Sequence, residues 1–481
     1  MLTCIVVSLL YRVVYLIQNG TLVIEHNTPT KSNSNINNIV MGVVAIYKLK
    51  RPQYLRYLAK ALLFYGYFIT SLFILFPVFL IRASLPGLGR WKYWKFHQAL
   101  FVFFTRHAIR SFMLFRFQPL IPRENGLRER GGPLGNLLEL LNLSGPGGHV
   151  SGKGLFARPD IEWFPPPPIE VFQGFFSIRI PEGTRVESPY YAGPALVDPE
   201  WTNVRTRGLW FMHNKGPVPK KGPLGSQKDP IILFVHGGSG VTFAAGDPFL
   251  GHTLTKTLVS TTGISALSVD YYLGPYATFP VQVIQTLAVF LSLVNDYGYT
   301  PGQIYLCGDS FGGFTVMLLE RYLRCEGSFL LSNIGGKAST HSGIPGVIIL
   351  SPLLRTRQMD EHYIRKVAKE ESYDIIDLHY LEWCFEALKM MYGFPAFELM
   401  KNNSPYISPY DMPSDELVQI SPMFLVLGGL EKFFDEDLIF AEKVKQAGGN
   451  ITTHVEVSLM KLLTSSMQCT ISALWPYFIL T

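Results

Sequence analysis

Charged side chains and cysteines are both scarce in this chain of 481 residues. Charged residues make up 16% of the chain, and the formal net charge is a modest +6. Much of the basic character flanks a long apolar run near the N-terminus, which indicates membrane anchoring rather than nucleic-acid binding. The five cysteines include no C-x-x-C pair and no spacing typical of a metal site. We therefore expect no nucleic-acid partner, no metal and no disulfide framework.

Phosphate-binding glycine motifs are missing at the turns where a nucleotide-binding domain would carry them. Residues 230–235 and 304–307 are predicted strands, and each ends in a glycine-rich turn. Neither turn contains G-x-x-x-x-G-K-[ST] or G-x-G-x-x-G. A nucleotide-binding α/β domain is thus disfavoured, and no cofactor is expected.

One long apolar run is present near the N-terminus. Residues 61–81 contain no charged side chain and are long enough to cross the hydrocarbon core of a bilayer. We predict a single-pass membrane span there, with a buried core helix as the alternative. Basic residues flank the run almost equally, so charge does not set its orientation. Sequons at Asn142, Asn402 and Asn450 would, if glycosylated, place the downstream region in a lumen.

A nucleophile motif follows the apolar run at 304–307. Gly308-Asp309-Ser310-Phe311-Gly312 comes directly after this predicted strand and leads into a predicted helix. The flanking glycines allow a sharp turn from strand to helix, which would expose the Ser310 hydroxyl above the sheet edge. Ser310 is therefore the candidate nucleophile.

A second glycine turn lies upstream, after the predicted strand 230–235. His236 opens it, and Gly237, Gly238 and Ser239 follow as candidate backbone donors to an oxyanion, together with Phe311 beside the nucleophile. Strands and helices alternate between the two turns, so we predict an α/β sheet with its chemistry at the carboxyl ends of the strands.

Three segments now carry a resemblance to a known family. Residues 236–238, 269–275 and 308–313 resemble the α/β-hydrolases related to hormone-sensitive lipase. With its basic, membrane-anchored N-terminus, the chain is most similar to the fungal steryl acetyl hydrolase group. The resemblance covers roughly residues 200–457. It implies an α/β-hydrolase fold with a mostly parallel central sheet and helices on both faces, hydrolysis of carboxylic esters by Ser310, and a lumenal catalytic domain in the endoplasmic reticulum.

The predicted domain organisation combines these features. A helical insertion at about 353–415 is expected to cover the substrate pocket as a lid, although packing of an accessory subdomain explains its aromatic residues equally well. The predicted segments are a poorly ordered extension (1–40), a membrane anchor (41–95), an interfacial helix and Pro/Gly-rich connector (96–200), the α/β-hydrolase domain (201–457) and an atypical tail (458–481).

A serine esterase also needs an acid and a base, which follow the serine in that order in this fold. Glu431 comes just after the predicted strand 422–429 and is the preferred acid, with Asp435 as second choice. The family resemblance places the histidine in the window 458–465, which contains none. His454, the only histidine after Glu431, is the remaining candidate for the base, although it lies inside a predicted strand and not after it.

Two functions remain open on these residues. The first is a membrane-anchored serine carboxylesterase, similar to lipases, that hydrolyses lipophilic acyl esters, with acetylated sterols among its candidate substrates. The second is a catalytically impaired membrane protein of the same fold that binds lipid or acts as a scaffold. The missing histidine supports the second, since loss of one triad member leaves activity far below that of the intact site. Nothing in the sequence indicates the oligomeric state.

Overall fold

The computed structural model describes the core of the predicted hydrolase domain and a short N-terminal segment. The described residues are 66–67, 69–84, 103, 106–107, 160–180, 188, 191, 195–241, 243–246, 251–274, 277–327, 329–330, 343–355, 376, 380, 404–429 and 431–456.

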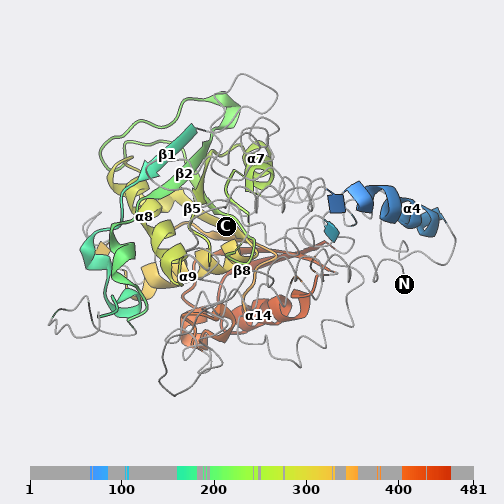
Figure 1. Cartoon of the computed structure of the whole chain (residues 1–481). Coiled ribbons are helices and arrows are strands. Elements are labelled where there is room, and N and C mark those ends of the chain that lie inside the picture. Colours follow the sequence, from blue (N-terminus) through green and yellow to red (C-terminus); the bar gives the residue numbers. More distant parts are fainter. Residues whose placement is uncertain are drawn as a thin grey trace, which may run out of the picture. The chain divides into compact units, whose positions relative to one another are not determined.

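An eight-stranded sheet forms the centre of this core, with strand order β1-β2-β4-β3-β5-β6-β7-β8 (Figure 1). The pairs β1–β2 and β2–β4 are antiparallel, and every other neighbouring pair in this sheet is parallel. The strands are β1 (Asp160–Phe164), β2 (Thr206–Phe211), β3 (Ile231–Val235), β4 (Ala266–Asp270), β5 (Ile304–Asp309), β6 (Val347–Leu350), β7 (Met423–Gly428) and β8 (Ile451–Glu456).

Helices cover both faces of the sheet. The strands β3, β4 and β7 are buried along their whole length, as expected for parallel strands with helices on either side. Leucines of α7 join one apolar cluster with Ile232 and Phe234 of β3, whereas α8 and α9 pack against each other on the opposite side of the strands (Figure 1). The longer helices here are α7 (Gly251–Thr262), α8 (Val281–Asn295), α9 (Phe311–Cys325) and α14 (Phe434–Gln446).

The sheet begins about forty residues before the predicted domain boundary at 201. Strand β1 lies in the segment predicted as connector, yet it pairs with β2 along five residues. Its Phe164 packs on Trp210 of β2, with ring centroids 6.5 Å apart. The predicted boundary was therefore too late. The reason is local: β1 is short, and the prolines 165–168 that follow it resemble a linker.

The described N-terminal segment includes the α-helix α4 (Phe76–Ser84), preceded by a π-helical turn over Ser71–Leu75. Within the described part of the chain, no helix combines the length and apolar character needed to cross a membrane. The span predicted at 61–81 extends beyond the described residues and stays a prediction. The extension 1–40, the tail 458–481 and most of the predicted interfacial helix and lid also lie outside them.

Candidate active site

The predicted nucleophile lies at a sharp turn between β5 and α9. Ser310 adopts φ 51° and ψ −116°, a left-handed conformation that is costly for any residue except glycine. A Cβ atom on Gly308 would lie 2.4 Å from the Gly312 carbonyl carbon, and one on Gly312 would lie 1.9 Å from the Val235 carbonyl oxygen. Both glycines are thus required by close backbone packing, which holds Ser310 in its strained conformation.

The glycine turn after β3 packs directly against this serine. A Cβ atom on Gly237 would lie 2.9 Å from the Ser310 Cβ. Three successive residues of the turn, Gly238, Ser239 and Gly240, have positive φ values of 104°, 57° and 70°. The predicted oxyanion turn and the predicted nucleophile therefore lie side by side, and Ser239 takes a backbone conformation that suits glycine better.

The geometry removes one of the predicted oxyanion donors. The Gly237 N–H donates to Asp309 Oδ1 at 2.8 Å, so it is not available to a substrate oxygen. Within the described ranges, the N–H of Ser239 makes no hydrogen bond, and Phe311 is the first residue of α9, where an N–H has no intrahelical acceptor. The prediction for Gly237 was wrong because its amide ties the turn to the elbow.

His236 supports the turn and does not contact the nucleophile. Its Nδ1 lies 2.8 Å from the Gly237 carbonyl oxygen, so this nitrogen carries the proton. The ring stacks on Tyr271, with centroids 4.3 Å apart, and the Tyr271 hydroxyl donates to the His236 carbonyl at 2.8 Å. Burial lowers the pKa of His236, so its neutral form is favoured.

A buried ion pair holds the far end of the same turn. Asp270, at the end of β4, accepts a hydrogen bond from the Ala245 N–H at 3.0 Å. Its other oxygen accepts from Arg207 Nε at 2.6 Å, and both side chains are almost completely buried. The sequence showed the segment that contains Asp270 but gave no sign of this pairing, which joins residues far apart in the chain.

Glu431, the preferred acid, is buried just past the end of β7. Its Oε1 accepts a hydrogen bond from the Ser351 hydroxyl at 2.5 Å. Asp435, the second choice, is exposed in the first turn of α14, where the helix dipole stabilises a carboxylate. Of the two carboxylates, only Glu431 is buried.

His454 does not reach Ser310 or Glu431. It lies within β8, and the ladder aligns it with Val426 of β7, Leu350 of β6 and Asp309 of β5. Three strand spacings separate His454 from Asp309, roughly 14 Å. Its Nε2 lies 3.8 Å from Glu456 instead. No histidine among the described residues is hydrogen-bonded to Ser310, and these residues contain no cluster of three metal-ligating side chains.

Such a sheet, with a serine elbow after β5 and a buried carboxylate after β7, defines the α/β-hydrolase fold. Residues 232–460 match a family described as the alpha/beta hydrolase fold. The described core therefore has the α/β-hydrolase fold, as the sequence predicted.

Several known proteins are similar to parts of it. Lipase 2 of Moraxella sp. strain TA144 is 24% identical over 243 residues, which cover 48% of this chain and 53% of the relative. An acetyl-hydrolase of Streptomyces hygroscopicus is 27% identical over 147 residues, covering 29% and 48%. The matched stretches thus span about half the length of these curated relatives. A solved structure of a Rhizomucor miehei esterase has 16% identity and a TM-score of 0.45, covering 57% of this chain and 78% of that one.

Proposed function

We propose that this protein is a membrane-anchored serine carboxylesterase, similar to lipases, that hydrolyses acyl esters of lipophilic alcohols. One observation carries the chemistry: the strained Ser310 elbow is packed against a glycine turn that has a backbone donor available. A nucleophile beside preorganised donors is the arrangement that acyl transfer requires.

In this proposal the Ser310 hydroxyl attacks the ester carbonyl carbon. The negative charge that develops on the carbonyl oxygen is stabilised by the N–H groups of Ser239 and Phe311. The alcohol then leaves with a proton, and water hydrolyses the acyl-enzyme to regenerate Ser310. Glu431 acts as the acid that orients the base and stabilises its protonated form.

The base is the open part of the proposal. The position of His454 in β8 argues against it, and His236 donates its Nδ1 proton within the oxyanion turn. Three other histidines downstream of Ser310, at 341, 362 and 379, lie outside the described residues. Each of them is a candidate that substitution can test.

The substrate class and the location are inferred from the names of the relatives, the apolar run and the family resemblance. Relatives with the names lipase and acetyl-hydrolase favour esters with a short acyl group or a lipophilic alcohol. The apolar run at 61–81 supports membrane attachment, and the family resemblance supports a lumenal site in the endoplasmic reticulum and acetylated sterols as substrates. All four points are part of the proposal.

The test is hydrolysis by the full chain in detergent, first of p-nitrophenyl acetate, butyrate and laurate, then of a sterol acetate. We expect hydrolysis of the short esters that Ser310→Ala abolishes. Single alanine variants of His341, His362, His379 and His454 would identify the base as the one whose loss equals that of Ser310→Ala. Hydrolysis no faster than that of a folded Ser310→Ala variant would contradict the proposal and favour the impaired lipid-binding protein.

A further inference from the structure

We propose that Ser351 is a positioning residue whose hydroxyl orients the Glu431 carboxylate, and that residues 350–353 fix this acid relative to the nucleophile. The inference rests on the proposed function, in which Glu431 is the acid. Ser351 follows β6, the strand that lies between the strand of the nucleophile and the strand of the acid.

The backbone of residues 350–353 is hydrogen-bonded to the nucleophile at two points. The Ser310 N–H donates to the Leu350 carbonyl at 2.9 Å, and the Leu353 N–H donates to the Ser310 carbonyl at 3.1 Å. Both bonds belong to the strained residue itself. Any shift of this segment would therefore move Ser310.

The same segment is bonded to the acid side of the sheet. The Ser351 N–H donates to the Val426 carbonyl of β7 at 2.8 Å, and the Ser351 hydroxyl donates to Glu431 Oε1 at 2.5 Å. Ser351 is 5% exposed and Glu431 is 7% exposed. A buried hydrogen bond to a carboxylate is short and strong, and it selects one orientation of the acceptor. The segment thus links nucleophile and acid through four hydrogen bonds.

The backbone conformation of Ser351 indicates that its side chain has a use. Its φ is 45°, in the left-handed region where glycine is favoured and other residues are strained. Glycine would satisfy the backbone at this position. Glycine has no hydroxyl, however, so only serine provides the hydrogen bond to Glu431.

A hydroxyl donor also affects the protonation of Glu431. Hydrogen bonding to the ionised carboxylate favours that form, so removing the donor raises the pKa of Glu431. The acid would then be protonated at a higher pH, and activity that needs the carboxylate would be lost earlier as the pH falls. A carboxylate can accept several hydrogen bonds, so the bond from Ser351 leaves capacity for the base.

The experiment measures the rate at which a fluorophosphonate labels Ser310 in the full chain, as a function of pH. Ser351→Gly removes the hydroxyl and the backbone strain, whereas Ser351→Ala removes the hydroxyl alone. We expect the labelling rate of both variants to be about 10- to 100-fold lower than that of the wild type, the range expected for one hydrogen bond to a charged group. The acid limb of both profiles should move to higher pH.

Two further variants separate orientation from folding. Ser351→Asn tolerates a positive φ and supplies an N–H donor, so it should recover part of the labelling rate. In Glu431→Gln, adding Ser351→Gly should cause little further loss, because both changes act on one interaction.

Each remaining outcome has a distinct meaning. Wild-type labelling rates and an unshifted profile in Ser351→Gly would overturn the inference and leave the proposed function standing. A wild type that labels no faster than Glu431→Gln would overturn the role of the acid and the inference with it. A folded wild type that is not labelled at all would overturn the proposed function, and with it the positioning role of Ser351.

Discussion

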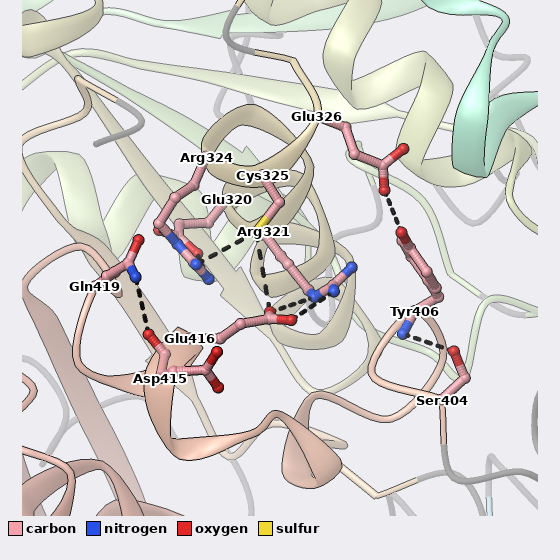
Figure 2. Close-up of polar contacts among 10 residues, drawn as sticks. All are labelled: Glu320, Arg321, Arg324, Cys325, Glu326, Ser404, Tyr406, Asp415, Glu416 and Gln419. Atoms are coloured by element: carbon pink, nitrogen blue, oxygen red, sulfur yellow. Dashed lines mark hydrogen bonds and ion pairs between the residues drawn. The ribbon is translucent and has the colours of Figure 1, made fainter. Parts of the chain in front are cut away.

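The two ends of α9 both carry buried polar groups, but they are organised in opposite ways. At the N-terminal end, Ser310 is strained, and the adjoining turn presents a backbone donor that has no acceptor among the described residues. At the C-terminal end, the charged side chains form ion pairs: Arg324 Nε lies 3.1 Å from Glu320 and Arg321 Nε lies 2.7 Å from Glu416 (Figure 2). The helix has 15 residues, so the two ends are roughly 22 Å apart.

The C-terminal cluster anchors the chain where it enters β7. Glu320 Oε1 accepts from both the N–H and the hydroxyl of Ser421 at 3.1 Å. Arg321 stacks over the ring of Tyr406 at 4.2 Å. Burial alone would lower the pKa of Arg321, but its hydrogen bonds and charge interaction with Glu416 raise it, so the guanidinium stays charged.

This difference separates a site built for stability from one built for chemistry. Buried charges that pair with each other hold segments together, and breaking one pair leaves a costly unpaired charge. Strained backbone and free donors weaken the fold locally, and they persist where binding or catalysis uses them. Substitutions at the two ends should therefore affect different quantities.

The largest effect is expected for Ser310→Ala at the N-terminal end. Removing the nucleophile should lower ester hydrolysis by about 10³-fold or more. The free energy of unfolding should change by less than about 1 kcal/mol, because alanine fits the same space. Hydrolysis assays and chemical denaturation measure the two quantities. A large loss of unfolding free energy would show that Ser310 stabilises the fold, as the charged residues at the other end of α9 do.

Glu320→Ala at the other end should show the reverse. Arg324 would be left buried without its partner, which costs about 3–5 kcal/mol of unfolding free energy. The labelling rate of Ser310, expressed per folded molecule, should not change. Glu442→Ala is the matched control: Glu442 pairs with Lys445 at 3.2 Å on the surface, where we expect a loss below about 1 kcal/mol. Equal losses in both variants would contradict the buried pair's role.

Tyr271→Phe should have an intermediate effect that appears in both quantities. It keeps the ring stacked on His236 and removes the hydroxyl bond to the His236 carbonyl. One lost hydrogen bond should lower the unfolding free energy by about 1 kcal/mol. Because the bond supports the oxyanion turn, labelling of Ser310 should also slow several-fold, by roughly the same free energy. A loss of stability with an unchanged labelling rate would show that the Tyr271 hydroxyl does not support the oxyanion turn.

The smallest effect is expected for His454→Ala. This side chain is partly exposed on β8, and its register places it away from Ser310. Hydrolysis should change by less than about 2-fold, well below the loss expected for a general base. A loss comparable with that of Ser310→Ala would show that His454 is the base.

The comparison also explains what the sequence could predict. The elbow at Ser310 is a local pattern of strand, glycines and helix, so it was visible in the sequence and the structure has this turn. The α/β sheet followed from the order of such patterns, and the family resemblance implied the α/β-hydrolase fold. By contrast, the bond from Ser351 to Glu431 joins residues 80 positions apart, and nothing in the sequence around Ser351 indicates that it contacts the acid. Contacts of this kind depend on which strands become neighbours.

Two errors have the same origin. Gly237 was predicted as an oxyanion donor because it belongs to the glycine turn, but its amide is directed to Asp309. Strand β1 was assigned to the connector because it is short and precedes four prolines, and its partner β2 lies further along the chain. In each case a partner that is distant in the sequence was missed.

Covalent labelling of the full chain with a fluorophosphonate, followed by mapping of the modified peptide, tests the central claim most directly. Reaction at neutral pH requires a serine that is activated by its surroundings. The wild type should be modified at Ser310 alone, and the folded Ser310→Ala variant should not be modified. A folded wild type with no adduct at Ser310, under conditions that label a known serine esterase, would contradict the claim that this elbow is an active site.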